Sequence, residues 1–182
     1  MYIASAKRKE NIAEYLLYMW QIEDIIRANN LDIDKIKSNI IDKFDLNDDQ
    51  RKELTEWYES LIDMMRRENV ETSGHLQLNK NTLLMLNDLH HALLKDPKFD
   101  VYASEFYKTL PYIVELRSRQ GESKLDEIET CFAALYGTLM LKLQGKGISV
   151  DTQKAIAQIT KFISLLSKYH KLDQEDKLWD NQ

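Results

Sequence analysis

The chain has 182 residues, of which 43% are hydrophobic and 30% are charged, a balance typical of a soluble globular domain. Its 25 basic and 30 acidic residues give a net charge of −5, which disfavours binding to nucleic acid or to an anionic membrane surface. The single cysteine, Cys131, excludes an intrachain disulfide and a cysteine-rich zinc site.

Helix signals follow one another along the chain, and only five Gly and two Pro interrupt them. Hydrophobic periodicity and capping residues predict helices over about 11–28, 32–44, 47–69, 82–95, 96–120, 123–144 and 149–170. Asn47 and Gln50 have the spacing of a capping box at the start of the third helix. Pro111 is expected either to kink the fifth helix or to restart it.

The fold class follows from this succession of helices with short connections. We predict an all-α fold, a single bundle-like domain of six or seven helices over residues 1–171. Residues 172–182 form an acidic tail that is expected to fray. The charged N-terminal stretch lacks the apolar core of a signal peptide, and the longest apolar run, 131–141, is about half a bilayer span. A cytoplasmic location is therefore expected.

Charged side chains fall on the expected buried faces of three helices. Glu23 lies on the apolar face of the first helix, with Arg27 at its edge. Arg117 and Glu129 lie on the apolar faces of the fifth and sixth helices. A buried charge is costly unless it is paired, so Arg117 is expected within salt-bridge reach of Glu23 or Glu129. Two interpretations stay open: an ion-pair network that fixes helix register, or the polar floor of a binding pocket.

Two adjacent histidines lie in the stretch NDLHHALL. His90 falls in the middle of an apolar face, whereas His91 points to the flank, where Asp88 can pair with it. The two rings therefore diverge and cannot chelate one metal ion together. We expect His90 to be a core residue hydrogen-bonded to a neighbouring helix. A mononuclear metal site built from His90, Glu23 and Glu129 is the alternative.

The stretch GHLQLNKN, residues 74–81, is a secondary candidate site because it gathers polar side chains, including His75, in the least regular internal part of the chain. The alternative interpretation is a connection whose polar residues cap the adjacent helices. The choice between the two depends on what His75 contacts.

Signatures of catalysis are missing from the sequence. It contains no Glu-x-x-His or His-Glu-x-x-His metal motif, no phosphate-binding glycine loop and no nucleophile elbow. Cys131 precedes Phe132 in an apolar helix, where a thiol is expected to be inert. We therefore predict no metal and no cofactor, and a non-catalytic protein is favoured over an enzyme.

The first predicted helix carries more apolar surface than one buried face requires, because Leu17, Tyr18 and Ile25 lie away from its main face. Such a helix is either central or covered by a partner. We predict a homodimer, or binding to another protein, with neither nucleic acid nor a membrane as partner. The alternative function is a ligand-binding protein or enzyme that uses Glu23, His90, Arg117 and Glu129 in a polar pocket inside the bundle.

Five segments of the chain resemble a family of helical proteins from Bacteroides-type gut bacteria whose domain has no assigned function. The segments are NIAEYLLYMWQIEDIIRA, EWYESLIDMMR, GHLQLNKN, LPYIVELRS and EIETCFAALYGTLMLKLQGKGIS. The resemblance covers about residues 8–170 and implies a bacterial, cytoplasmic, single-domain protein. It assigns no catalytic residue, although Glu23, Arg27, His75, Arg117 and Glu129 all lie within the similar segments.

Overall fold

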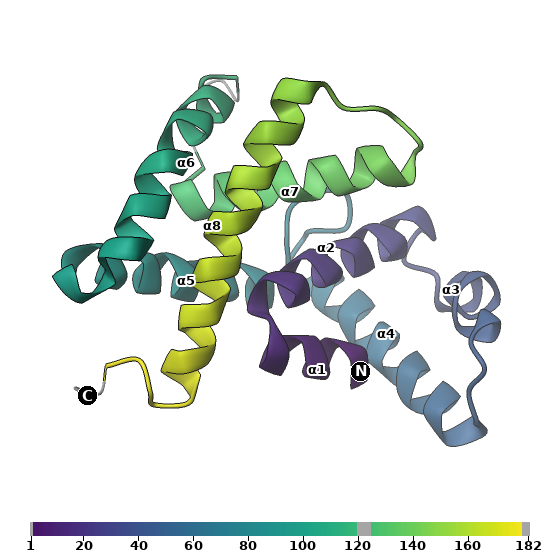
Figure 1. Cartoon of the computed structure of the whole chain (residues 1–182). Coiled ribbons are helices and arrows are strands. Elements are labelled where there is room, and N and C mark those ends of the chain that lie inside the picture. Colours follow the sequence, from purple (N-terminus) through teal and green to yellow (C-terminus); the bar gives the residue numbers. More distant parts are fainter. Residues whose placement is uncertain (1, 120–124, 180–182) are drawn as a thin grey trace. The chain divides into compact units, whose positions relative to one another are not determined.

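The structure, a computed structural model of the whole chain, describes residues 2–119 and 125–179 (Figure 1). The regular elements in these ranges are all helical. They are α1 (Tyr2–Glu10), α2 (Ile12–Ala28), α3 (Ile33–Asn39), η1 (Ile41–Lys43), α4 (Asp48–Arg67), α5 (Gln77–Lys95), η2 (Pro97–Phe99), α6 (Asp100–Ser118), α7 (Glu127–Leu143) and α8 (Val150–Gln174), where η1 and η2 are 3₁₀ helices. The all-α prediction is confirmed, but the described residues form eight α-helices rather than six or seven.

The additional helix is α1, which hydrophobic periodicity does not reveal. Ala4 is the only buried side chain among those described in α1. Charged side chains connect α1 to α2 instead: Lys7 forms a salt bridge with Glu14 at 2.8 Å, and the Arg8 guanidinium lies 5.7 Å from the centre of the Tyr15 ring. Apolar patterns carry no signal for such contacts.

Side-chain caps fix where most of the predicted helices begin. Asn47 accepts a hydrogen bond from the Gln50 backbone N–H, and the Gln50 side chain accepts one from the Asn47 backbone N–H, so the predicted capping box is present. The side chains of Asp32, Asp126 and Ser149 accept hydrogen bonds from backbone N–H groups in the first turns of α3, α7 and α8. The predicted start at residue 123 lies outside the described residues, and α7 begins after Asp126.

Pro111 does not restart the fifth predicted helix, because α6 runs without a break from Asp100 to Ser118. Proline removes one backbone hydrogen bond from a helix interior. The buried side chains of Phe106 and Thr109 before it and Ile113 after it hold both halves of α6 against their neighbours, which offsets this loss.

The longest apolar stretch of the sequence lies in α7. Several of its side chains are only half-buried, but the helix has 17 residues and contains three charged ones, Glu127, Glu129 and Lys142. Across the described ranges, every helix is either too short or too polar to span a bilayer.

The chain divides into two compact units. The first holds the residues up to Lys9 together with Glu14–Asn81, and the second holds Glu10–Ala13 together with the residues from Thr82 onwards. The boundary falls inside α5. The single-domain assignment of residues 1–171 stays a prediction.

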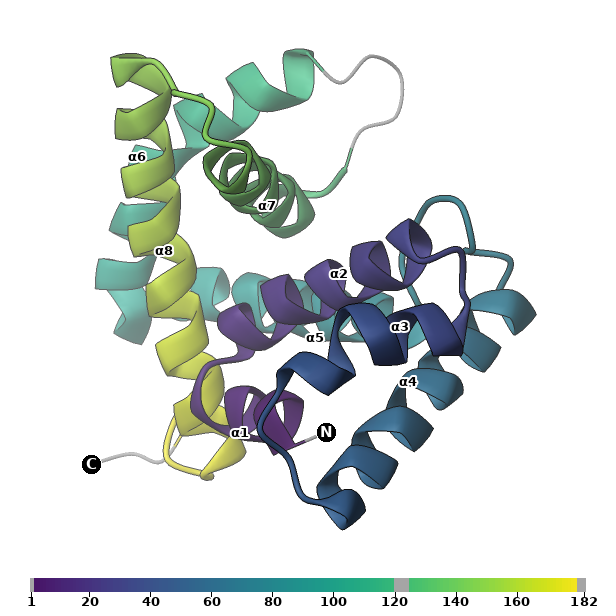
Figure 2. The same cartoon turned by 90° about the vertical axis from the view of Figure 1, so that its right-hand side faces the viewer.

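In the first unit, the apolar faces of α2, α3 and α4 supply the core, and α3 packs beside α4 (Figure 2). The fully buried side chains of this unit are Leu16, Ile26, Ile36, Ile41, Leu61, Met65 and Leu76. Their burial is the main stabilising contribution, at about 25 cal/mol per Å² of apolar surface removed from water.

In the second unit, α6, α7 and α8 pack against one another in pairs (Figures 1 and 2). Three fully buried aromatic residues, Tyr102, Phe132 and Phe162, occupy the core between them. The tilted rings of Tyr102 and Phe162 lie 5.4 Å apart, within the range of favourable aromatic contacts.

The described part of the C-terminal tail, up to Trp179, packs within the second unit, and fraying of the tail over residues 172–182 stays a prediction. Helix α8 extends to Gln174, and Leu178 is 3% exposed. The Trp179 ring packs edge-on against Phe99, and its indole N–H donates a hydrogen bond to Asp173 at 2.6 Å. Burial of Leu178 and the contacts of the Trp179 ring, which stays 44% exposed, therefore hold this part of the tail in place.

Candidate functional site

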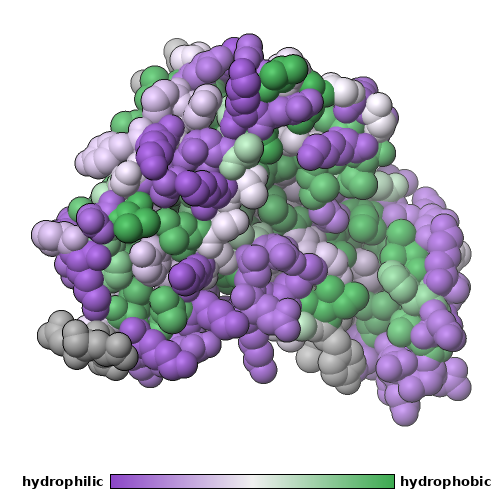
Figure 3. All heavy atoms as spheres, in the orientation of Figure 1, coloured by the Kyte–Doolittle hydropathy of each residue, from purple (hydrophilic) through white to green (hydrophobic). Residues whose placement is uncertain are grey.

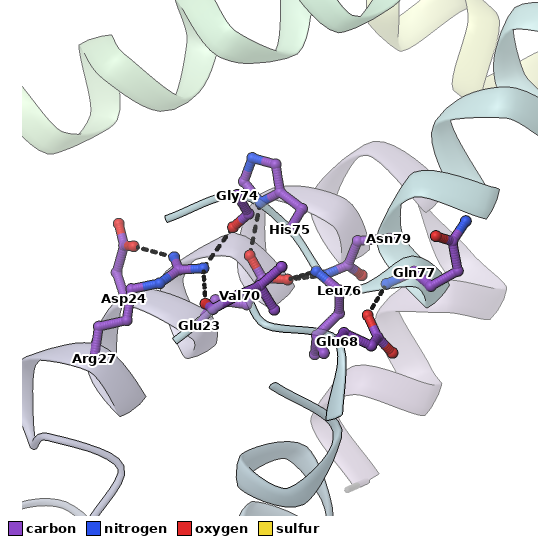
Figure 4. A network of polar contacts seen from close by, with 10 residues as sticks. All are labelled: Glu23, Asp24, Arg27, Glu68, Val70, Gly74, His75, Leu76, Gln77 and Asn79. Atoms are coloured by element: carbon purple, nitrogen blue, oxygen red, sulfur yellow. Dashed lines mark hydrogen bonds and ion pairs between the residues drawn. The ribbon is translucent and has the colours of Figure 1, made fainter. Parts of the chain in front are cut away.

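Glu23 is a fully buried carboxylate in α2, and three groups from the start of α5 contact it (Figure 4). One oxygen, Oε2, lies 2.6 Å from His75 Nδ1. The other, Oε1, accepts hydrogen bonds from the Leu76 backbone N–H at 2.9 Å and from Asn79 Nδ2 at 2.6 Å. These contacts offset the cost of removing the carboxylate from water.

Glu23 and Glu68 together cap the N-terminus of α5. The first turn of a helix leaves backbone N–H groups without partners and carries a partial positive charge. The Leu76 N–H donates to Glu23, and the Gln77 N–H donates to Glu68 Oε2 at 2.5 Å. The two carboxylates come from α2 and from the residue that ends α4, so the start of α5 is fixed by distant parts of the first unit.

Arg27, one turn after Glu23, binds the connection between α4 and α5. Its guanidinium pairs with Asp24 at 2.9 Å and donates to the backbone carbonyls of Val70 at 3.1 Å and Gly74 at 2.5 Å (Figure 4). Gly74 has a φ of 85°, a conformation that other residues adopt only with strain. Arg27 therefore holds the connection against α2 where the chain turns.

His75 is held between a carboxylate and an aromatic ring. Its ring stacks on Trp20 with centroids 4.1 Å apart and planes inclined by 12°, and its side chain is 27% exposed. Nδ1 faces Glu23, and Figure 4 shows the other ring nitrogen, Nε2, pointing away from the carboxylate. A histidine oriented in this way can act through Nε2 as a base or a ligand.

The geometry brings three of the predicted site residues, Glu23, Arg27 and His75, into one network. Within the described chain, no group of three or more His, Cys, Asp or Glu side chains is arranged to hold a metal ion. The network joins α2 to the α4–α5 connection at several points, which matches the ion-pair interpretation of Glu23 and the capping interpretation of residues 74–81.

His90 is 1% exposed, and its Nδ1 lies 2.7 Å from the Tyr102 hydroxyl on α6, so the prediction of a core histidine is confirmed. Burial lowers the pKa of His90 to about 4, helped by the nearby His91 and opposed by Glu127. The expected pair of His91 with Asp88 is wrong: His91 Nδ1 lies 2.7 Å from the Asn87 carbonyl of its own helix.

Arg117 pairs with Glu127, rather than with Glu23 or Glu129 as expected. The two charged groups are 2.5 Å apart, and their side chains are 27% and 29% exposed. Burial raises the pKa of Glu127, but hydrogen bonds from its own backbone N–H and from Arg117 outweigh this and lower it. Arg117 lies near the end of α6, and its long side chain reaches the first turn of α7. A helical wheel gives the direction of a side chain around its own helix, so it does not identify a partner on another helix. Glu129 is half-buried.

Because this pair is partly solvated, Arg117→Met is expected to lower the free energy of unfolding by only about 1 kcal/mol. A double-mutant cycle with Glu127→Gln, followed by urea denaturation, measures the coupling between the two side chains. The matching cycle with Glu129→Gln should give a coupling near zero. A larger coupling to Glu129 than to Glu127 would contradict this pairing.

A buried carboxylate that the sequence argument missed ties α6 to α8. Glu105 is 6% exposed and bonds Lys108 at 2.8 Å, Lys161 at 3.0 Å and Gln158 at 3.2 Å. The hydrogen bonds from Lys108, Lys161 and Gln158 lower the pKa of Glu105 to about 2. Its place beside Phe106 on the buried face of α6, with Lys108 three residues later, is the signal that could have revealed it.

The sequence profile of the family described as a domain of unknown function, DUF4924, matches residues 1–177. The chain belongs to this family. No curated protein and no solved structure matches it. The DUF4924 match includes both the Glu23 network of the first unit and the Glu105 cluster of the second, so both lie within the family domain.

Proposed function

We propose that this member of the DUF4924 family is a non-catalytic binding protein that self-associates through the outer face of α6. The observation that carries this proposal is a stripe of uncharged, exposed side chains along that helix. The stripe consists of Ser104, Tyr107, Pro111, Val114 and Ser118, spaced alternately by three and four residues. Tyr107 and Val114 are 64% and 58% exposed. This spacing is the seam along which helices pack in pairs.

The stripe is unusual for an exposed surface of this chain. The outer face of α4 is typical, and most of its exposed residues are charged: Asp48, Asp49, Lys52, Glu56, Glu59, Asp63, Arg66 and Arg67. The opposite face of α6 is already buried against α7 and α8. Apolar side chains left exposed in a row favour a covering partner.

Charge complementarity supports a second copy of the chain as that partner. Lys108 and Glu115 flank the stripe, at equal distances along α6 from a point between Pro111 and Tyr112. If two α6 helices cross antiparallel on a two-fold axis at this point, Lys108 of each copy lies beside Glu115 of the other. A two-fold dimer is the commonest closed assembly.

The side chains that suggested a dimer from the sequence alone contribute less to this argument. Leu17, Tyr18 and Ile25 of α2 are half-buried within the chain. The proposed self-association therefore uses α6 rather than α2.

Light scattering coupled to size-exclusion chromatography tests the proposal. The parent is expected to be a dimer at micromolar concentration, and Val114→Glu is expected to raise the dissociation constant at least roughly tenfold, because it places two like charges near the axis. Leu84→Glu is the matched control: Leu84 is 57% exposed on α5, outside the stripe, so the dimer of this variant should be as stable as that of the parent. A monomeric parent would rule the proposal out.

The flanking charges allow a second test of the same interface. Glu115→Lys should weaken the dimer, because it places a lysine beside Lys108 of the other copy, and Glu115→Gln should weaken it less, because it removes the attraction without adding repulsion. Lys108 itself is kept, since it also pairs with the buried Glu105. A dimer that Glu115→Lys does not weaken would argue against the antiparallel arrangement.

We also infer a cytoplasmic location and a bacterial origin. The lone Cys131 supports a reducing compartment, and the resemblance of the five segments supports bacteria. Cell fractionation with an antibody against the chain tests the location, and recovery in the membrane fraction would contradict it.

A further inference from the structure

A pocket of about 340 Å³ lies in the first unit, and nothing in the proposed self-association uses it. Its lining residues come from four separate segments: Ile3 of α1, Tyr18 of α2, Phe44 and Leu46 of the connection after η1, and Gln50, Glu53, Leu54 and Tyr58 of α4. Pockets that take small molecules start at about this volume, roughly 300–1,000 Å³. In Figure 3, hydrophobic residues gather on the right of the view, where α3 and the connection to α4 lie, with hydrophilic residues around them.

The walls of this pocket are apolar and aromatic. Ile3, Phe44 and Leu54 supply aliphatic and ring surface, and Ile3 and Phe44 keep about half of their surface exposed, at 52% and 48%. The rings of Tyr18 and Tyr58 complete the walls. Burial raises the pKa of Tyr18 and raises that of Tyr58 to about 12, so both phenols are protonated at neutral pH.

The pocket contains one acidic group that forms no ion pair within the described part of the chain. Among the described residues that line it, Glu53 is the only charged one, and no described residue pairs with it. The neighbouring basic side chains of α4 are engaged elsewhere: Arg51 with Asp42, and Lys52 with Glu56. The Glu53 carboxylate is therefore available to pair with a cationic ligand in the pocket.

We propose that this pocket binds a small organic amine, a primary or quaternary ammonium group on an apolar, preferably aromatic, body. The apolar body fills the space between Phe44, Leu54 and Ile3. The ammonium group pairs with Glu53 and lies near the faces of Tyr18 and Tyr58, where cations are attracted to the ring quadrupole. An anionic ligand of the same size is disfavoured because its charge would lie beside an unpaired carboxylate.

The location of the walls favours a small molecule over a partner helix. A helix binds in a groove that is open along its length, with anchors at every third or fourth residue. Here the walls come from four separate segments, α1, α2, the connection after η1 and α4, and the volume of about 340 Å³ matches a small molecule rather than a helix. The proposal is independent of the α6 interface, because the pocket residues and the stripe belong to different units.

Calorimetric titration with 2-phenylethylamine, compared with the uncharged 2-phenylethanol and the anionic 3-phenylpropionate, tests the ligand class. The amine is expected to bind saturably and at least roughly tenfold more tightly than the alcohol, since only the amine forms a charge-assisted hydrogen bond. The anion is expected to bind more weakly than both. Equal binding of amine and alcohol, or no saturable binding of the amine, overturns the proposal.

Two matched variants on α4 place the ligand. Glu53→Gln should weaken amine binding at least roughly tenfold and leave alcohol binding unchanged, because only the charge is removed. Glu56→Gln, one turn further along the helix and outside the pocket, should bind the amine like the parent. Amine binding that survives Glu53→Gln would place the ligand elsewhere and overturn the assignment. Unchanged circular dichroism of both variants shows that they are folded, and a dimeric parent that binds no amine would leave the α6 interface intact.

Discussion

Glu23→Ala is expected to lower the free energy of unfolding by about 3–5 kcal/mol, the scale for removing one side of a buried polar pair. Glu23 is fully buried, and its loss leaves the His75 ring, the Leu76 N–H and the Asn79 amide without their acceptor. The total stability of a domain is only about 5–15 kcal/mol, so this single change should remove a large part of it.

Urea denaturation followed by far-ultraviolet circular dichroism measures the effect. Glu23→Gln should cost less than Glu23→Ala, because its carbonyl oxygen can still accept from one of the donors. Glu14→Ala, on the exposed side of the same helix, is the control and should cost less than about 1 kcal/mol, since its salt bridge to Lys7 is solvated. If Glu23→Ala unfolds like Glu14→Ala, the network contributes nothing to stability.

Acidification from pH 7 to pH 4 is expected to lower the free energy of unfolding of the parent by about 3 kcal/mol through His90 alone. The pKa of His90 falls from an ordinary value of 6.5 to about 4 in the folded chain. Between these values the unfolded chain binds a proton that the folded chain does not. The His90 contribution to the free energy of unfolding is therefore fully present above about pH 6.5 and is lost as the pH falls toward 4. Below about pH 4, His90 causes no further change in stability.

A His90→Gln variant separates this effect from the titration of carboxylates. Between pH 7 and pH 4 the free energy of unfolding of the parent should fall by about 3 kcal/mol more than that of the variant, because the titration of the carboxylates lowers it equally in both proteins. His91→Gln, which changes the adjacent exposed histidine, should keep most of the loss seen in the parent, because burial is the larger cause of the lowered His90 pKa and His91 the smaller one. Parallel curves for the parent and His90→Gln would show that the His90 pKa is not depressed.

What could be predicted from the sequence is local. The capping pattern at Asn47 and Gln50 uses groups three residues apart, so the local sequence alone predicts it. The central position of His90 on an apolar face likewise requires burial, whatever the neighbouring helix is. Glu23 was identified as a buried charge in need of partners for the same reason.

What could not be predicted is the identity of distant partners. Two of the donors to Glu23 are a backbone N–H and a ring nitrogen more than fifty residues away, and side-chain periodicity says nothing about backbone groups. Helical periodicity gives the direction of a side chain around its own helix axis. It does not tell which residue along a neighbouring helix that side chain meets. This is why periodicity predicts a pair of Arg117 with Glu23 or Glu129 rather than with Glu127, and why it does not reveal the lysine partner of Glu105 on α8.

The connection between α4 and α5 has no regular secondary structure, yet side chains hold its backbone at Val70, Gly74 and Leu76, and that of Gln77 where α5 begins. Connections on a protein surface usually tolerate insertions, because lengthening a loop adds little entropy cost. Here an added residue at most positions would move a carbonyl away from Arg27 or an amide away from a carboxylate. Residues 71–73 lie between the Val70 and Gly74 carbonyls that Arg27 binds, and no described side chain holds their own backbone. Length variation among homologous chains should therefore be confined to these three residues, and the rest of the connection should keep its length as strictly as a helix does.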